Sequence, residues 1–280
     1  MKSRMKPFKA VVIVLAGFFL IPFVASTQFT REEIASFEAW EAFLRKAEIL
    51  SFRQLKGPEA VSEPWIFELQ TKDRNGRGLW KNVTGMPKGF PENWKAEVAA
   101  YRLSRLLGLE MVPPTVERRF LGMAGSVQAW IEGTRSLKEL IEQNIVTPPE
   151  RGNDWVRAFF IQQAFDNLIA NYDRHQGNYL ITPDWRMILI DHSRALQAGS
   201  KFDTELIFDK NSAGDEAAYM RQLPRTFVDK LRALDFSAIR SAVDRYLTDK
   251  EIRAVLTRRD LILKCLDRRI REWGEESVLY

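Results

Sequence analysis

Three side chains in the middle of the chain have the types and the spacing that phosphoryl transfer requires. Asp173 lies in a polar loop, Asn178 follows five residues later, and Asp191 stands thirteen residues beyond Asn178. Apolar residues 179–182 and 187–190 are separated by Pro-Asp-Trp, which predicts a β-hairpin with Asn178 and Asp191 at the same end. In phosphoryl transfer, one carboxylate orients or deprotonates the attacking hydroxyl, while an Asn and a second carboxylate hold divalent metal on the nucleotide phosphates. We therefore expect Asp173 to be catalytic and Asn178 and Asp191 to be metal ligands.

A Gly-rich turn further upstream predicts a second hairpin. Residues 65–69 and 79–83 are strand candidates, and the turn between them contains Gly76 and Gly78. The backbone N–H groups of such a turn can donate hydrogen bonds to nucleotide phosphates, so both glycines are candidate cofactor-binding residues. A solvent-exposed hairpin has the same pattern, so the turn alone does not decide between the two interpretations.

The second of these strands carries a lysine that we expect to point inward. Lys81 alternates with Leu79 and Val83, and alternate residues of a strand share a face. An inward-pointing lysine requires an anion, which can be a carboxylate, a phosphate or both. We predict that Lys81 contacts nucleotide phosphates. The alternatives lie in polar stretches and are Lys72, Lys88 and Lys95.

Residues 94–107 predict a helix with one apolar face, and Gly108 is its candidate C-cap. Glu97 lies in the first turns beside small residues, which would let the helix approach a sheet closely enough for Glu97 to meet Lys81. The alternative interpretation is a solvated glutamate, since the helix dipole favours negative charge at this end. Less favoured partners for Lys81 are Glu92 and Glu110.

Secondary structure elsewhere follows from capping and periodicity. Residues 30–50 predict one accessory helix that begins with the capping box Thr30-x-x-Glu33. Residues 126–132 form one of two further strand candidates, and the chain from Leu223 to its end is expected to be helical. The other strand candidate spans residues 115–120.

The central segment, FDNLIANYDRHQGNYLITPDWRMILID, resembles the catalytic and metal-binding core of the protein-kinase-like fold. Its DRH opening is similar to the phosphoinositide 3/4-kinases. FDNLIANYDRH, together with Asp191-His192, is closer to the secreted, Golgi-type kinases of the four-jointed and casein-kinase group. The upstream stretch EVAAYRLSRLLGLEMVPP resembles a segment of the same group. The resemblance covers roughly residues 65–273.

The resemblance implies an α+β, bilobal kinase-like fold. The smaller lobe, of sheet and helix, would span residues 27–132, and a mainly helical lobe with the catalytic loop and metal site would span residues 133–280. Glu97 would be the ion-pair partner of Lys81. Trp130 and Ile131 would lie in the hinge between the lobes, where they would supply apolar contact to adenine.

The activity implied is that of an atypical kinase. It would use ATP with Mg²⁺ or Mn²⁺ and transfer the γ-phosphate to a hydroxyl acceptor, which could be a protein Ser/Thr, a sugar or a lipid. Asn178 matches the lipid kinases, whereas the secreted group often has an acidic residue there, so the acceptor stays open.

The sequence departs from kinases after the second metal ligand, where DHSRAL stands in place of the usual D-F-G. This departure motivates an alternative, a catalytically silent pseudokinase or nucleotide-binding scaffold for an exported partner. A third possibility keeps the nucleotide site but transfers another group, such as AMP.

Composition and charge set further bounds. The 280 residues are 45% hydrophobic and 28% charged, which is typical of a globular protein. The formal net charge is +5, but Lys2, Arg4, Lys6 and Lys9 supply four of these charges, so the remainder is near +1 (5 − 4). No basic stripe with interleaved aromatic residues is present, so we expect no nucleic-acid partner.

Residues 1–26 read as an export signal or a membrane anchor. A basic stretch precedes an apolar run, and Val24-Ala25-Ser26 offers small residues for cleavage. We therefore expect an exported protein, periplasmic or extracellular, with membrane association if the segment is retained. Cys265 is the only cysteine, so no intramolecular disulfide can form, and we expect it to be a buried core residue. Because the eukaryotic secreted kinases carry disulfides, the chain is expected to be a bacterial exported member.

Overall fold

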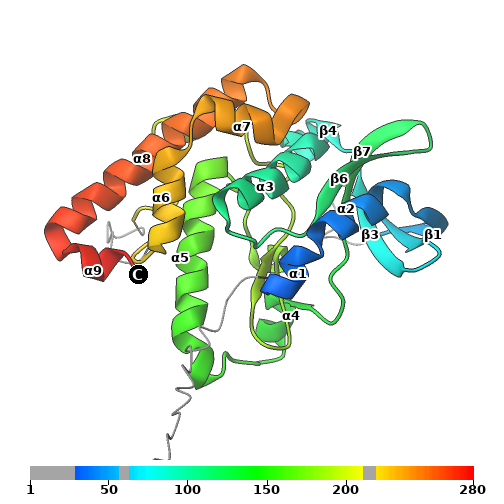
Figure 1. Cartoon of the computed structure of the whole chain (residues 1–280), viewed down its shortest axis with the longest axis horizontal. Coiled ribbons are helices and arrows are strands. Elements are labelled where there is room, and N and C mark those ends of the chain that lie inside the picture. The colour runs from blue at the N-terminus through cyan, green and yellow to red at the C-terminus, as the bar shows by residue number, and fades with distance from the viewer. Residues whose placement is uncertain (1–28, 57–62, 211–218) are drawn as a thin grey trace, which may run out of the picture.

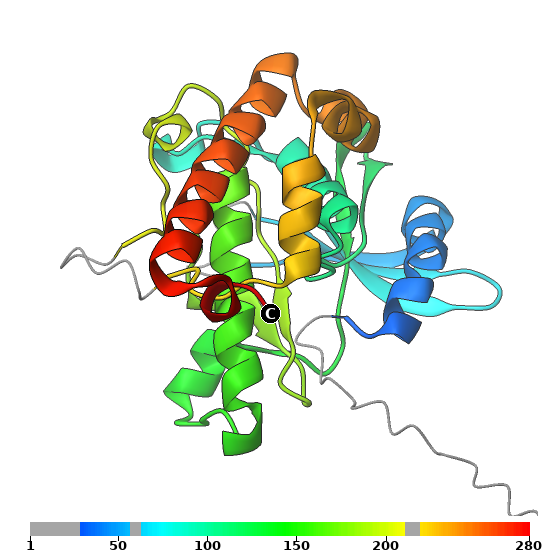
Figure 2. The ribbon, with the colours of Figure 1, turned by 60° about the vertical axis from the view of Figure 1, so that its left-hand side comes forward.

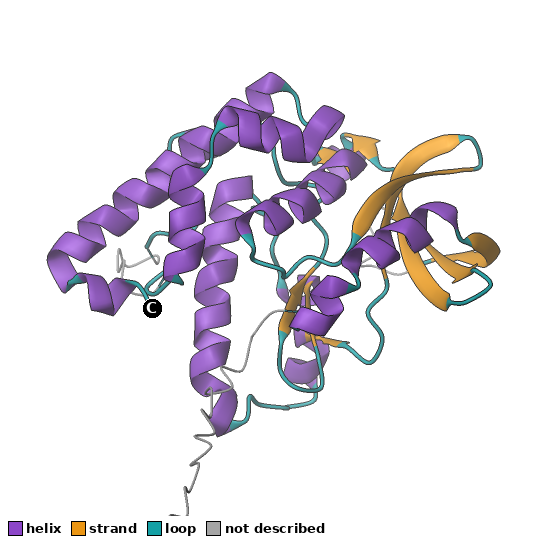
Figure 3. Ribbon diagram, in the orientation of Figure 1, coloured by secondary structure: helices purple, strands orange, loops and turns teal. Residues whose placement is uncertain are grey.

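The chain folds into a strand-rich part and a helical part, which Figures 1 and 3 show side by side. The computed structural model describes residues 29–56, 63–210 and 219–280. The strand-rich part contains a five-stranded antiparallel sheet in the order β1-β2-β3-β7-β6. Most of the remaining chain is helical, so the predicted α+β, bilobal fold is confirmed.

The strands of the described residues form three sheets. The large sheet contains β1 (Glu48–Gln54), β2 (Trp65–Gln70), β3 (Asn75–Lys81), β6 (Thr115–Phe120) and β7 (Met123–Ala129). A two-stranded sheet pairs β4 (Thr84–Gly85) with β5 (Glu92–Asn93). A three-stranded sheet in the helical part contains β8 (Arg135–Ser136), β9 (Tyr179–Ile181) and β10 (Met187–Leu189).

The helices are divided between the strand-rich part and the helical part. The strand-rich part contains α1 (Arg31–Ala35), α2 (Phe37–Lys46) and α3 (Trp94–Leu107). The helical part contains α4 (Leu137–Glu142), α5 (Gly152–Ile169), α6 (Arg225–Ala233), α7 (Phe236–Val243), α8 (Asp249–Trp273) and α9 (Glu275–Val278). Within the described residues, no helix combines the length and the apolarity needed to cross a bilayer. The predicted signal or anchor, residues 1–26, lies outside those residues.

Strand β3 presents its two faces to different helices. Trp80 is fully buried in a cluster with Phe43 and Leu44 of α2, while Lys81 contacts Glu97 of α3. Successive side chains of a strand point to opposite faces, so the sheet is covered by α2 on one face and approached by α3 on the other. The lysine predicted to point inward does so because it lies on the α3 face.

The prediction of a single accessory helix over residues 30–50 is wrong. The chain forms α1 and α2, with the capping box at Thr30 confirmed, and then enters strand β1 at Glu48. Strand β1 pairs with β2, and the ring of Phe52 lies 5.6 Å from that of Trp65. This pairing across the sheet outweighs the helical spacing of the local sequence.

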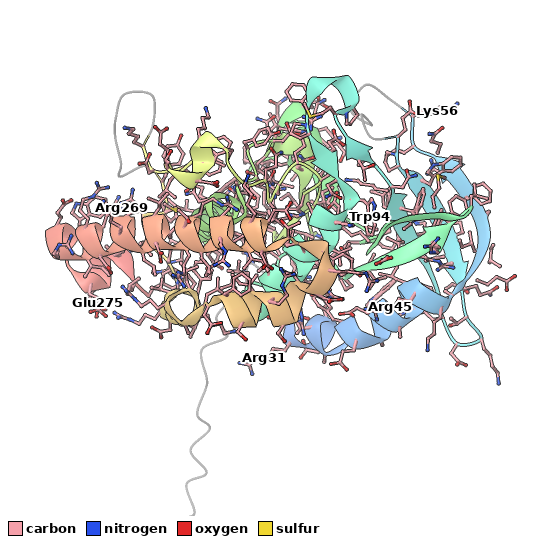
Figure 4. The ribbon with its side chains drawn as sticks, turned by 90° about the horizontal axis from the view of Figure 1, so that it is seen from above. Arg31, Arg45, Lys56, Trp94, Arg269 and Glu275 are labelled. Atoms are coloured by element: carbon pink, nitrogen blue, oxygen red, sulfur yellow. The ribbon has the colours of Figure 1, made fainter. Side chains whose placement is uncertain are left out.

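The helical part is built around α5, with α8 packed beside it (Figure 2). Two arginines of α8, Arg258 and Arg269, are fully buried, and both donate to backbone carbonyls of neighbouring segments. Figure 4 labels Arg269 on this helix, toward the end that is remote from the sheet. Cys265 is buried in the same helix, as predicted. The helical prediction for the chain after Leu223 is confirmed.

Candidate active site

The centre of the site is a buried lysine held between two carboxylates. Lys81 Nζ lies 2.7 Å from Glu97 Oε1 and 2.8 Å from Asp191 Oδ1. The side chains of Lys81 and Glu97 are 6% and 3% exposed, whereas Asp191 is 36% exposed. The expected contact between Lys81 and Glu97 is present. One cation therefore ties strand β3, helix α3 and the segment after β10 together.

Local sequence explains how α3 delivers Glu97. The Asn93 side chain accepts a hydrogen bond from the Lys95 N–H and caps the helix, which places Glu97 in its first turn. The small side chains of the buried residues Ala96 and Ala100 let the helix approach its neighbours closely. The helix ends at Gly108, which has the left-handed φ of 64° predicted for a C-cap.

Burial and charge act in opposite directions on the Lys81–Glu97 pair. Burial alone would lower the pKa of Lys81, but Asp191 and Glu97 outweigh it and hold that pKa above its ordinary value. Burial would raise the pKa of Glu97, but Lys81 and His192 hold it well below its ordinary value. The backbone N–H of His192 donates to Glu97 Oε2 at 3.0 Å. Both members of the pair are therefore charged at neutral pH.

The loop that contains Asp173 is fixed by a buried arginine. Arg174 makes a bidentate ion pair with the fully buried Asp166: Nε donates to Oδ2 at 2.8 Å and Nη2 donates to Oδ1 at 3.0 Å. Its Nη1 also donates to the carbonyl oxygens of Asn178 and Ile190. Because Arg174 follows Asp173 directly, this network holds the loop of Asp173 against the start and the end of the hairpin.

The hairpin brings the two predicted metal ligands to one end, as expected. Tyr179 pairs with Leu189, and the N–H of Ile190 donates to the carbonyl of Asn178 at 3.2 Å. Asp191 then adopts a left-handed φ of 59°, an uncommon conformation for a residue with a side chain and a frequent one at functional sites.

The donor set suits a hard divalent cation. Asn178 and Asp191 offer oxygen ligands, which Mg²⁺ and Mn²⁺ prefer. Among the described residues, no group of three or more His, Cys, Asp or Glu side chains is arranged to hold a metal ion. A cation at this position would therefore need other oxygens, such as those of nucleotide phosphates and water, to complete its shell.

Comparison with solved structures shows what this arrangement resembles. No protein-family model matches the sequence, and no curated protein matches it. The structure of hydra Fam20 with sugar aligns with a TM-score of 0.64 and 16% identity, over 92% of this chain and 95% of that one. The fold is that of an atypical kinase.

Two further structures agree with this kinase fold. The Golgi casein kinase with Mn/ADP bound has a TM-score of 0.62 at 16% identity, covering 91% of this chain and 80% of that one. A Helicobacter pylori proinflammatory kinase, CtkA, has a TM-score of 0.51 at 16% identity, covering 81% and 98%. At such identities the likeness establishes the fold, which resembles the Golgi-type kinases as predicted.

The residues predicted for the hinge of this kinase fold follow the end of β7. The Trp130 N–H donates to the Arg77 carbonyl at 3.0 Å, and the Arg77 guanidinium lies 4.7 Å from the centre of the Trp130 ring. Trp130 and Ile131 line a cavity of about 590 Å³ beside α1 and α2. Lys81 and Asp191 do not line this cavity. The contact of Trp130 and Ile131 with adenine stays a prediction.

The prediction that Gly76 and Gly78 lie in a turn is wrong. Strand β3 already begins at Asn75, so both glycines lie within the strand. A Cβ atom on Gly76 would lie 3.1 Å from the Phe43 ring, and one on Gly78 would lie 2.7 Å from Val127. Both glycines thus let α2 and the sheet pack closely. Their role at nucleotide phosphates stays a prediction that this geometry does not favour.

Asp173 has a charged partner that sequence reasoning missed. Arg194 Nη1 lies 3.0 Å from Asp173 Oδ2, and the same guanidinium pairs with Glu92 at 2.9 Å. Glu92, a less favoured partner for Lys81 by sequence, pairs with Arg194 instead. The pairs join residues far apart in the sequence, so no local spacing signals them.

Proposed function

We propose that the protein is an ATP-dependent phosphotransferase that transfers the γ-phosphate to a hydroxyl acceptor. The observation that carries the proposal is the ionised Lys81, held by Glu97 and Asp191 inside a kinase fold. Asp173 and Asn178 lie on the adjoining loop. In kinases, such a lysine, its glutamate and the metal-binding aspartate must all be in place for transfer.

Each residue of the cluster has a distinct role in this proposal. Lys81 contacts the nucleotide phosphates, and Glu97 keeps its ammonium group in place. Asn178 and Asp191 hold Mg²⁺ or Mn²⁺, which neutralises charge on the phosphates when it is bound. Asp173 orients the acceptor hydroxyl, since a loose transition state requires positioning more than strong deprotonation.

The related structures support the cofactor and widen the choice of acceptor. The solved structure of the Golgi casein kinase has Mn/ADP bound, which supports ATP with a divalent metal as the donor, and hydra Fam20 was solved with sugar. The acceptor classes that we propose are protein, sugar and lipid hydroxyls. We also propose export, resting on residues 1–26, and a division between the lobes near Glu132.

One observation favours a second candidate, a pseudokinase or nucleotide-binding scaffold. Ser193-Arg194 stands in place of the Phe-Gly of kinases, and Arg194 already contacts Asp173. A protein that held its catalytic carboxylate in this way without using it would bind nucleotide and release no product.

Calorimetric titration of ATP in the presence of Mn²⁺, followed by product analysis, separates these functions. The phosphotransferase binds saturably and forms ADP, and Asp191→Ala removes the metal-dependent turnover while leaving the protein folded. Saturable binding without product supports the scaffold, and release of pyrophosphate indicates AMP transfer. Absence of binding contradicts all three.

A further inference from the structure

Arg194 links a carboxylate of the strand-rich part to the catalytic loop. Its Nε and Nη2 donate to Glu92 Oε1 at 3.0 and 2.9 Å, and its Nη1 lies 3.0 Å from Asp173 Oδ2. Glu92 lies in β5, directly before helix α3, whereas Asp173 follows α5. One guanidinium group thus spans the two parts of the molecule at the site of proposed chemistry.

The anchored side of this bridge is rigid. The side chains of Glu92 and Arg194 are 2% and 13% exposed, and the Phe90 ring lies 4.6 Å from the guanidinium carbon. The backbone next to Arg194 is also held, since the Asn93 N–H donates to the Ser193 carbonyl at 2.7 Å. A planar guanidinium fixed through two of its nitrogens has little freedom left at the third.

The third nitrogen, Nη1, is therefore held in a fixed position for its ion pair with Asp173, which is 36% exposed. It engages Oδ2 of that carboxylate. The shortest contact of the pair involves Oδ2, and among the described residues no hydrogen bond is made to the other oxygen, Oδ1. A carboxylate held through one oxygen keeps the second available for a hydroxyl, and correct placement of reacting groups is a large part of catalysis.

We propose that Arg194 is a positioning residue for phosphoryl transfer: it fixes the Asp173 carboxylate so that its second oxygen receives the acceptor hydroxyl. This inference rests on the proposed function. Because Glu92 belongs to the segment that leads into α3, the orientation of Asp173 follows the position of the strand-rich part. Arg194 thereby couples the arrangement of the two parts to the readiness of the catalytic loop.

A double-mutant cycle tests the coupling with Arg194→Ala, Asp173→Asn and the double variant in the full chain. The rate of ADP release at saturating ATP and Mn²⁺ is the readout. We expect Arg194→Ala to lower kcat by about 10- to 100-fold and to leave the KM for ATP within about threefold. Because Arg194 acts through Asp173, the double variant should be about as slow as Asp173→Asn alone.

Two further variants separate positioning from charge and from folding. Arg194→Lys keeps the charge and the aliphatic stem but lacks the planar fork, so it should recover little of the lost kcat. Arg225→Ala removes another ion-paired arginine, which contacts Glu275 and Glu276 at the far end of the chain, and should match the wild type. Urea unfolding of each variant checks that the fold is kept, and Arg194→Lys continues the test if Arg194→Ala does not fold.

The outcomes are distinct. Losses in the double variant that multiply would show that Arg194 acts independently of Asp173 and would overturn the proposal. Wild-type kcat in Arg194→Ala, or a kcat above it, would overturn this proposal alone and leave the proposed function standing. A wild-type protein that forms no ADP would remove the proposed function and this inference together.

Discussion

At the residue scale, the site is centred on one cation with two anionic partners. Lys81 is almost fully buried, and its charge is balanced by Glu97 inside the protein and by Asp191 at the edge of the site. Breaking a buried pair on one side is costly because the remaining charge has neither water nor a partner. Effects on stability and on turnover can therefore be separated by choosing which residue of the Lys81–Glu97–Asp191 cluster is replaced.

Replacing Lys81 with Met should abolish turnover and destabilise the protein by about 3–5 kcal/mol, because the Glu97 carboxylate stays buried without its cation. The double variant Lys81→Met/Glu97→Gln should regain part of that stability and none of the turnover. Urea unfolding and ADP release measure the two effects. Turnover retained in Lys81→Met would contradict its phosphate role.

The pKa of Glu97 gives a pH-dependent prediction. The pKa of this carboxyl is held below its ordinary value of 4.5, so the folded state gains stability from the charged form above that pH. The gain is lost as the pH falls through and below 4.5, toward the folded-state pKa. The difference in unfolding free energy between wild type and Glu97→Gln should therefore shrink as the pH is lowered from about 7 to about 3. A difference that stays constant would mean that Glu97 is not charged in the folded protein.

At the element scale, the comparison between sequence and structure shows which signals are local. Helix α3 and the β9–β10 hairpin were predicted because their caps, periodicity and turn residues lie within the elements themselves. Strand β1 and the packing of Gly78 were not, because both depend on contacts with distant parts of the chain.

The same reasoning explains the successes and failures at the site. Asp173, Asn178 and Asp191 could be picked out because their spacing and the hairpin between them are local. The Arg194–Glu92 contact joins residues 102 positions apart, and the Arg174–Asp166 pair competes with several equally plausible partners. Tertiary packing alone selects these partners.

A glycine of β7 tests how tightly β3 must be held. A Cβ on Gly125 would lie 2.4 Å from the Lys81 carbonyl oxygen. Because this oxygen belongs to the backbone of β3, the strand itself would have to shift. Gly125→Ala should destabilise the protein by about 1–3 kcal/mol and lower turnover, since β3 must shift with Lys81.

Gly152 provides the matched control, because a Cβ there meets nothing within 4 Å and the residue begins α5. Gly152→Ala should leave turnover unchanged and raise stability by up to about 1 kcal/mol. Thermal unfolding of both variants is the measurement. Equal effects of the two substitutions would speak against close packing at Gly125.

At the scale of the whole molecule, several contacts join the strand-rich and helical parts. Glu33 of α1 pairs with Arg186 in the β9–β10 turn, and the Asn93 N–H donates to the Ser193 carbonyl. In Figure 1, α2 runs on from α1 toward the sheet. The cluster at Lys81 sits where the two parts meet, so a ligand there should stabilise the fold as a whole.

We expect ATP with Mn²⁺ to raise the melting temperature. A ligand that binds only the folded state at a concentration of 100 times its Kd adds about 2.7 kcal/mol to stability. The rise should be much smaller for Asp191→Ala, which lacks a metal ligand, and unchanged for Arg225→Ala. Differential scanning fluorimetry provides the measurement. An equal rise in Asp191→Ala would place the nucleotide or its metal elsewhere.

The most direct test follows the γ-phosphate itself. Wild type, Asp173→Asn and Asp191→Ala are incubated with Mn²⁺ and ATP labelled in its γ-phosphate, with a protein extract, sugars or lipids as acceptors, and the products are separated. We predict that the label leaves ATP for a hydroxyl or for water, that ADP forms in equal amount, and that both variants lose this transfer. Label that stays in ATP with the wild type, or that leaves equally fast in Asp191→Ala, would contradict it.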